Sequence, residues 1–146
     1  MPVPQVGSKA PDFPGLKDYK GKNIVLYFYP KDDTPGCTVE ACGLRDSFKE
    51  IEKLGAVILG VSPDSAKSHD KFIAKFQLPF PLIPDEEKKI CQDYGVWVEK
   101  SMYGKKYMGV ARTTFIIDGN GKIAKVSEKV KPEGHEKEII EALKSL

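Results

Sequence analysis

The stretch Ile24-Val25-Leu26-Tyr27-Phe28-Tyr29 is continuous, β-branched and aromatic, and the interpretation of the fold starts from it. A run of this kind is expected of a strand buried on both faces. After a polar segment rich in Pro and Gly, residues 44–54 place apolar side chains on one helical stripe, and Gly55 stands where a helix C-cap is wanted. A second apolar run, residues 56–61, follows at once. Strand, helix and strand at this spacing predict a right-handed βαβ unit with parallel strands.

Farther along the chain we expect two more helices. Asp64 or Ser65 can cap the first of them, which carries Phe72 and Phe76. The second is a short helix over residues 86–94, which follows a cluster of prolines.

The last third of the chain predicts a β-hairpin. Residues 113–117 and 122–126 flank Asp118-Gly119-Asn120-Gly121, a strong turn signal, and a final helix starts at about Glu133. We therefore expect an α/β fold with a mixed central β-sheet flanked by helices on both faces. Residues 1–146 are expected to form one domain.

Length and charge exclude several classes of protein. A chain of 146 residues typically builds one core without disulfides. Its 23 basic and 21 acidic side chains leave a net charge of +2, without the concentrated basic face that nucleic-acid binding needs. No apolar run approaches the ~20 residues of a membrane span and no signal peptide is visible, so we expect a cytoplasmic protein without a membrane partner. Three cysteines, an odd and small number, favour free or redox-active thiols.

Cys37 lies where the first buried strand gives way to the helix. Thr34 can be the N-cap, Pro35 then occupies the first helical position, and Cys37 falls in the first turn. Free backbone N–H groups and the positive end of the helix dipole favour a thiolate there, and the thiolate is the nucleophilic form of cysteine. The alternative is that Thr34 only caps the helix and Cys37 is an inert buried thiol.

Cys42 follows five residues later on the same predicted helix. The helical rise and radius put the two Cα atoms roughly 8–9 Å apart. Disulfides rarely join Cα atoms more than ~7 Å apart, so an intact helix cannot hold this bond. Either Cys42 is a small core residue, or the start of the helix unwinds so that the two sulfurs can meet. The spacing leaves both alternatives open.

Residues 28–46, FYPKDDTPGCTVEACGLRD, resemble the active-site segment of peroxiredoxins. They contain the family's Pro-x-x-x-Thr-x-x-Cys motif as Pro30, Thr34 and Cys37. The sequence from Cys42 through the following Gly-Leu-Arg-Asp is similar to the corresponding segment of the bacterioferritin comigratory protein (peroxiredoxin Q) subfamily. The same holds for residues 94–97 and 112–118. The resemblance implies a thioredoxin-like fold and thiol-dependent reduction of hydrogen peroxide and organic hydroperoxides, with no cofactor and no metal.

The resemblance also implies a role for each of five residues. Cys37 matches the peroxidatic cysteine, which attacks a peroxide oxygen and becomes a sulfenic acid, and Cys42 matches the resolving cysteine. Thr34 and Arg112 match the residues that bind the peroxide, and Pro30 matches the residue that shields the sulfur from water. A thioredoxin or similar dithiol protein would reduce the Cys37–Cys42 disulfide by exchange. The subfamily favours a monomer.

The use of arginine supports the assignment of Arg112 independently. Only Arg45 and Arg112 are arginines among the 23 basic residues. A chain that otherwise uses lysine needs a planar fork or a permanent charge where it uses arginine. Arg112 directly precedes a predicted buried strand, so it could project toward Cys37. For Arg45 we favour a helix-surface charge or a structural salt bridge.

The remaining candidates receive structural interpretations. We expect Cys91 to be a core residue and the two histidines, His69 and His135, to lie on the surface, without metal-ligand spacing to any cysteine. Turns are predicted at two pairs of residues, Asp32 with Asp33 and Lys105 with Lys106. The segment between residues 10 and 22 is short for the family, so its N-terminal hairpin is expected to be truncated or absent.

Three other functions compete with the two-cysteine peroxidase. One is a peroxidase cycle that uses Cys37 without Cys42. Another is a general thiol–disulfide oxidoreductase, which the Cys-x4-Cys spacing disfavours because such enzymes use a Cys-x-x-Cys pair. The last is a non-enzymatic redox sensor in which oxidation of Cys37 changes partner binding.

Overall fold

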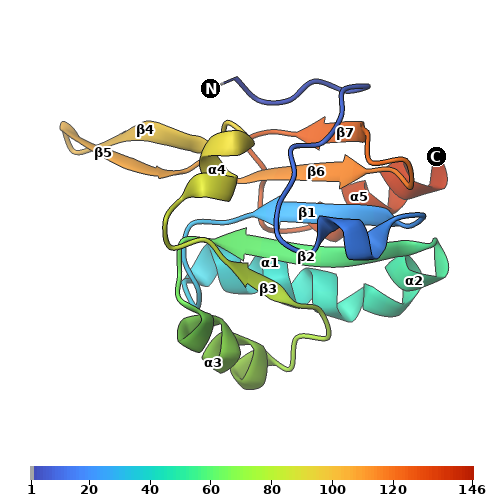
Figure 1. Ribbon diagram of the computed structural model, residues 1–146. Helices are drawn as coiled ribbons and strands as arrows, with labels where there is room; N and C mark the ends of the chain where they lie inside the picture. Colours follow the sequence, from blue (N-terminus) through green and yellow to red (C-terminus); the bar gives the residue numbers. More distant parts are fainter. Residues whose placement is uncertain (1) are drawn as a thin grey trace.

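Five strands form a mixed sheet in the computed structural model, which describes residues 2–146 (Figure 1). They lie in the order β3-β2-β1-β6-β7, with the bounds β1 (Asn23–Phe28), β2 (Ala56–Ser62), β3 (Leu82–Pro84), β6 (Thr113–Ile117) and β7 (Ile123–Ser127). Strands β1, β2 and β3 run parallel, whereas β6 is antiparallel to β1 and β7 is antiparallel to β6. The predicted βαβ unit, the predicted late hairpin and the mixed sheet are therefore confirmed.

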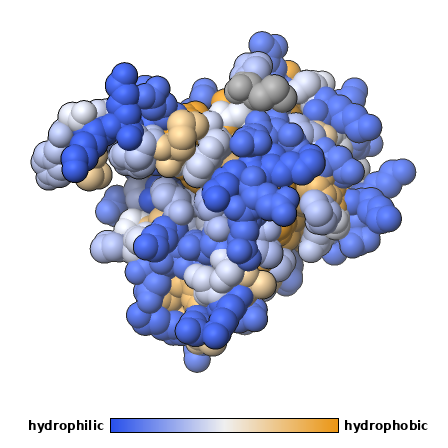
Figure 2. Space-filling model, turned by 60° about the vertical axis from the view of Figure 1, so that its left-hand side comes forward, coloured by the Kyte–Doolittle hydropathy of each residue, from blue (hydrophilic) through white to orange (hydrophobic). Residues whose placement is uncertain are grey.

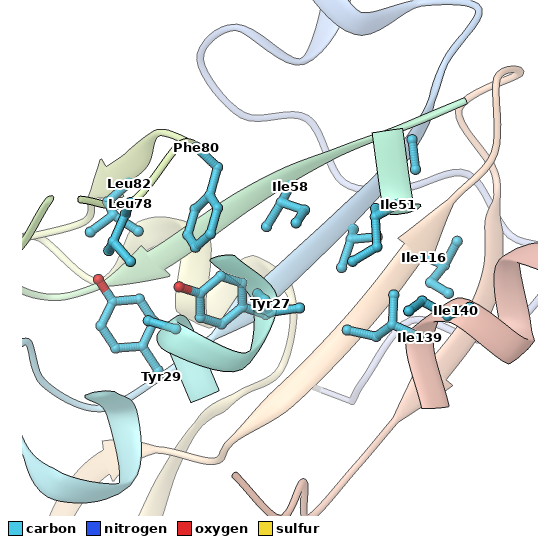
Figure 3. Close-up of a cluster of buried hydrophobic side chains, with 14 of the residues drawn as sticks. Tyr27, Tyr29, Ile51, Ile58, Leu78, Phe80, Leu82, Ile116, Ile139 and Ile140 are labelled. Atoms are coloured by element: carbon cyan, nitrogen blue, oxygen red, sulfur yellow. The ribbon is translucent and has the colours of Figure 1, made fainter. Parts of the chain in front are cut away.

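Four helices cover one face of the sheet: α1 (Pro35–Asp46), α2 (Phe48–Lys53), α3 (Ala66–Phe76) and α5 (His135–Lys144). Their apolar side chains pack on the sheet in one core cluster, part of which Figure 3 shows. Within it, the ring of Tyr27 stacks on that of Tyr29 with centroids 5.3 Å apart and meets the edge of Phe80 at 6.0 Å. Each such aromatic pair contributes about 0.5–1.5 kcal/mol beyond burial. These contacts fix the end of β1, from which the chain leads into α1.

The opposite face is covered by the N-terminal segment and by the short helix α4 (Lys89–Asp93), which cross in front of the sheet in Figure 1. Side chains of β1 alternate between the two faces, so that Leu26 and Phe28 belong to this second core cluster. The hydroxyl of Tyr94 donates a hydrogen bond to the carbonyl of Pro11 at 2.6 Å and ties the N-terminal segment down. Strand β1 is therefore buried on both faces, as its sequence predicts.

A two-stranded hairpin, β4 (Trp97–Met102) and β5 (Lys105–Val110), projects from the sheet at the left of Figure 1. Sequence analysis did not predict it. The expected turn at Lys105 and Lys106 is wrong, because these exposed residues begin β5. The turn lies at Tyr103 and Gly104, whose φ angles of 51° and 78° are left-handed.

Other elements differ in their bounds from the prediction. The helix predicted through residue 54 is two helices, since Ser47, with φ −100° and ψ 7°, ends α1 and precedes α2. Helix α3 begins after Ser65, whose hydroxyl accepts a hydrogen bond from the N–H of Ser68, so the expected cap is confirmed. Residues 2–22 contain a 3-10 turn, η1 (Leu16–Tyr19), and one bridge from Lys9 to Lys122, with no hairpin of their own.

Hydrophilic side chains dominate the surface that Figure 2 shows, and hydrophobic ones form small separate areas. The largest exposed apolar side chains within residues 2–146 include Met102, Tyr103, Tyr107 and Met108 of the projecting hairpin. Every helix in this range is too short or too polar to span a bilayer.

Candidate active site

The topology of the sheet brings the loop after β1 close to the residue before β6. Because the two strands are antiparallel, Phe28 at the end of β1 pairs with Thr113 at the start of β6. The parallel strands β2 and β3 end at the same edge of the sheet, which is where open α/β sheets hold their functional groups. Arg112 therefore lies beside the segment that leads into α1.

Cys37 is the third residue of α1 and is 1% exposed. Pro35 occupies the first helical position, as predicted, and the N–H of Thr38 donates to the carbonyl of Thr34 at 2.8 Å to open the helix. The Nη2 group of Arg112 donates to the sulfur of Cys37 at 3.3 Å. The expected projection of Arg112 toward the start of the helix is thus confirmed.

Glu40 shares this guanidinium, and sequence analysis missed it. Its Oε1 atom accepts from Nη1 of Arg112 at 2.7 Å, while its Oε2 atom has no hydrogen-bond partner among the described residues. Burial raises the pKa of Glu40 to about 7, although the charge and the hydrogen bond of Arg112 act in the opposite direction. The available signal was its position, since residues three apart on a helix lie on the same face as each other, and Glu40 follows Cys37 by three.

Thr34 and Pro30 lie on the segment before α1, with partly buried side chains. Thr34 is the N-cap residue by position, but its side chain makes no capping hydrogen bond. Its hydroxyl instead donates to the carbonyl of Lys31 at 2.9 Å. The described contacts of Thr34 thus stay within the loop, and no hydrogen bond joins it to the sulfur of Cys37.

Cys42 lies on the same helix as Cys37, and both thiols are free. Its side chain is half-buried, whereas Cys91 is completely buried, as predicted. Burial, followed by the hydrogen bond and charge of Asp85, raises the pKa of Cys91 well above that of an ordinary thiol. Cys91 therefore has the buried, apolar setting that is typical of structural cysteines.

The projecting hairpin adds a second cation, Lys100 of β4, which sequence analysis also missed. Burial and the nearby charge of Arg112 lower the pKa of Lys100, while the charge of Cys37 acts in the opposite direction. Arg45, by contrast, lies on α1 and donates to Asp46 and to the carbonyl of Phe76, at 3.0 and 2.8 Å. The structural interpretation of Arg45 is confirmed.

His69 and His135 are 1% and 3% exposed, so the prediction that they lie on the surface is wrong. His69 shares the buried face of α3 with Phe72, and its Nδ1 atom lies 2.8 Å from a carboxylate oxygen of Asp32. The Nε2 atom of His135, on α5, lies 2.8 Å from the hydroxyl of Thr114. Asp32 does lie in the predicted turn, but its side chain is buried in an ion pair, which a simple turn residue does not require.

Among residues 2–146, Asp32, Asp64 and His69 are the one group whose ligand atoms lie close enough together to consider a metal ion. Both ring nitrogens of His69 already face protein oxygens, on Asp32 and on the carbonyl of Ile83. A metal ligand needs a nitrogen lone pair directed at the ion. The group is therefore a hydrogen-bonded cluster and does not fit a metal.

Comparisons with known proteins agree with this geometry. Residues 6–126 match the model of the AhpC/TSA family. A Coxiella burnetii protein named putative peroxiredoxin bcp is 50% identical over 145 residues, which cover 93% of this chain and 96% of that protein. A structure of a Xylella fastidiosa PrxQ mutant has a TM-score of 0.91 at 34% identity, covering 99% of this chain and 98% of the other. The Xanthomonas campestris bacterioferritin comigratory protein, whose structure is described in terms of its alkyl peroxide reduction activity, has a TM-score of 0.85 at 44% identity, with 89% and 83% covered.

Proposed function

Since the chain belongs to the AhpC/TSA family and is a thiol-dependent peroxidase of the Bcp/PrxQ peroxiredoxins, we propose that Cys37 is the residue that reduces the peroxide. Its thiolate attacks one peroxide oxygen, and the O–O bond breaks as the S–O bond forms. Cys37 is oxidised to a sulfenic acid, and the other oxygen leaves as water or an alcohol after it gains a proton. Hydrogen peroxide and organic hydroperoxides are both suitable substrates for this step.

One observation carries the proposal: the 3.3 Å contact between Nη2 of Arg112 and the sulfur of Cys37 at the start of α1. A guanidinium there stabilises the thiolate before the attack and the negative charge on the leaving oxygen during it. The oriented N–H groups of the first helical turn act in the same direction. We assign substrate binding to Arg112 and Thr34 and shielding of the sulfur to Pro30.

The next step is assigned to Cys42. Its sulfur attacks the sulfenic sulfur of Cys37, water leaves, and an intramolecular disulfide forms. Because both cysteines lie on α1, the start of the helix has to unwind for this bond to form. A thioredoxin-type dithiol then reduces the disulfide by exchange, and α1 can reform.

Replacement of Cys37 by Ser tests the assignment of the nucleophile. Peroxide consumption with a dithiol donor should fall to the rate of the donor alone, whereas Cys91→Ser should keep the wild-type rate because Cys91 lies in the other core cluster, on the opposite face of the sheet from Cys37. Retained turnover in the Cys37→Ser variant would refute the assignment.

The role of Cys42 needs its own measurement. Mass spectrometry of peroxide-treated wild type should find an intramolecular Cys37–Cys42 disulfide, and Cys42→Ser should lose turnover with thioredoxin and over-oxidise more easily. If wild type instead accumulates a sulfenic acid without a disulfide, the one-cysteine cycle replaces this scheme. A peroxide rate constant no greater than that of a free thiol would favour the redox sensor.

We also propose a setting for this activity. A dithiol reductant works where thiols stay reduced, so we assign the chain to the cytoplasm, where structural disulfides are rare. We assign it no nucleic-acid or membrane partner, in keeping with its net charge of +2. Sedimentation of the reduced protein should show a monomer.

A further inference from the structure

The loop between β1 and α1 is tied to its surroundings mainly through one residue, Asp32. Its N–H donates to Asp64 at 2.8 Å. Its carboxylate accepts from three groups: the hydroxyl of Tyr29 at 2.6 Å, the hydroxyl of Ser68 at 2.7 Å and the ring of His69 at 2.8 Å. These partners come from the residue directly after β1, from the segment after β2 and from α3, so a single loop residue joins three parts of the fold.

His69 completes the attachment on the other side. Its Nδ1 atom faces Asp32, and its Nε2 atom lies 3.1 Å from the carbonyl oxygen of Ile83 on β3. Two acceptors, one at each ring nitrogen, require that both nitrogens carry a proton. The geometry therefore favours the imidazolium form of the ring, paired with the carboxylate of Asp32, and both residues are buried, with His69 1% and Asp32 8% exposed.

The electrostatics agree with this protonation state. Burial alone would lower the pKa of His69, but the hydrogen bond and charge of Asp32 and the Ile83 carbonyl outweigh it and raise the pKa. Burial alone would raise the pKa of Asp32, but hydrogen bonds from His69, Tyr29 and Ser68 outweigh it and lower the pKa.

We infer that Asp32 and His69 are positioning residues that hold residues 30–34 in the conformation from which Cys37 attacks peroxide. The inference rests on the proposed roles of Cys37 and Cys42. The pair touches neither substrate nor sulfur. It fixes the loop that ends at Thr34, the residue before α1, and thereby sets the direction of the helical N–H groups.

The pair also sets a balance between two conformations. Attack on peroxide needs the loop and the first turn of α1 in place, while formation of the Cys37–Cys42 disulfide needs that turn unwound. A ligand or contact present in only one of two states shifts the equilibrium toward that state. Loss of the pair should therefore slow the reaction with peroxide and favour the formation of the disulfide.

The balance should depend on pH through His69. The ionisable groups that face its ring are Asp32 on the loop, Tyr29 beyond β1 and Asp64 after β2, with the Ile83 carbonyl on β3. A histidine whose pKa is raised in the folded state stabilises that state fully below about pH 6.5 and loses the contribution as the pH rises through the raised pKa. Tyr29 stays neutral throughout, because burial raises its pKa far above the ordinary value.

The decisive variant is His69→Gln, which removes the charge and keeps an amide donor. Its matched control is Lys75→Gln, because Lys75 also lies on α3 and contacts the same loop, at Asp33, but through an exposed pair 2.8 Å long. Stopped-flow measurement should find the second-order rate constant with hydrogen peroxide about 10- to 100-fold lower in His69→Gln, as when a reacting group is displaced by about 1 Å. Lys75→Gln should react at the wild-type rate, since exposed pairs contribute little.

Four further readouts separate positioning from mere stability. In His69→Gln the disulfide should form from the sulfenic acid at least as fast as in wild type, and a smaller fraction should over-oxidise. The ratio of wild-type to variant rates should shrink between about pH 6 and pH 9, because the wild type loses the charge of His69 over this range and the variant has none to lose. Amide hydrogen exchange of residues 30–36 in the reduced variant should be faster than in Lys75→Gln.

A folded His69→Gln variant that reacts with peroxide at the wild-type rate overturns the inference. If that variant does not fold, Ser68→Ala removes one donor to Asp32 more gently, and an unchanged rate there also overturns it. Failure of the proposed function looks different: wild type and Cys37→Ser would then consume peroxide equally, while nitrogen NMR of the His69 ring and amide exchange would still report the state of the pair.

Discussion

The guanidinium of Arg112 has two acceptors, the carboxylate of Glu40 at 2.7 Å and the sulfur of Cys37 at 3.3 Å. Its planar fork can serve both at once from a fixed position, which a lysine ammonium on a flexible chain cannot do. The side chain of Glu40 is completely buried, so the pair is shielded from solvent on that side. The two contacts, made by two nitrogens of one planar group, indicate that position 112 requires the geometry of arginine.

Arg112→Lys tests that requirement. The positive charge stays but the fork is lost, so the rate constant with peroxide should fall about 100-fold, in the range seen when one donor to a developing charge is removed. Arg45→Lys, which changes the other arginine of the chain, should leave the rate unchanged. Equal rates in the two variants would show that charge alone is sufficient at position 112.

Glu40 makes the stability of the protein depend on pH. Its pKa is about 7 in the folded protein against 4.5 ordinarily, so the folded state binds the proton more tightly than the unfolded state does. The free energy of unfolding should therefore fall as the pH rises from about 4.5 to about 7, by roughly 3 kcal/mol from this group. The free energy of unfolding of wild type and of Glu40→Gln should be measured in urea across this pH range, and the difference between the two should change by that amount. Parallel profiles would contradict the shift.

Strand β2 packs so closely on its neighbours that Gly60 has no room for a side chain. A Cβ atom there would lie 2.6 Å from Leu82 Cδ2 and 2.9 Å from the ring of Tyr27. Gly60→Ala should therefore lower the free energy of unfolding by about 1–3 kcal/mol, the cost of overpacking. Gly43→Ala on α1 is the control, because a Cβ there meets only the carboxylate of Glu136, which can move away, and alanine is the better helix former. A loss of stability as large as that of Gly60→Ala would show that Glu136 is fixed.

The elements that were predictable are those whose burial imposes a regular pattern. Strands β1 and β2 are buried over nearly their whole length and read as continuous apolar runs. The hairpin β4–β5 is solvated along most of both strands, with the alternation of apolar and polar side chains largely lost. Only its turn, Tyr103-Gly104, was available as a signal. Strand β3 has three residues and ends in Pro84, too short to predict from periodicity.

The predictable part of the candidate site consists of residues that lie close together in the sequence. Residues that come together only in the folded chain were harder to predict. The positions of Cys37 and Cys42 on one helix followed from the spacing of α1. Glu40 and His69 did not, because isolated acidic residues and histidines are most often solvated. His69 could have been found from its spacing of three residues to Phe72, which puts both on the buried face of α3.

One sheet separates the two core clusters of the protein, and β1 contributes side chains to both. We propose that residues 1–146 unfold as a single domain. Both core clusters pack on the same sheet, so unfolding of the sheet would expose both clusters to water. Thermal unfolding followed by far-UV circular dichroism, which reports mainly the helices of the first cluster, should coincide with the fluorescence of the single tryptophan, Trp97, which packs on the second. Two separate midpoints would instead indicate two units.

The break at Ser47 has a consequence for the length of chain available to the redox step. Helix α1 has 12 residues and is therefore about 18 Å long, while the same residues extended would span roughly 40 Å. The loop is held at Asp32 before the helix, and α2 packs on β2 and α5 after it. Each residue that changes from the helical to the extended conformation thus adds about 2 Å to the length of chain between these two fixed ends. We expect that release of the first one or two turns brings the two sulfurs together, while the packing of α2 on β2 and α5 keeps the released length of chain on the N-terminal side of Ser47.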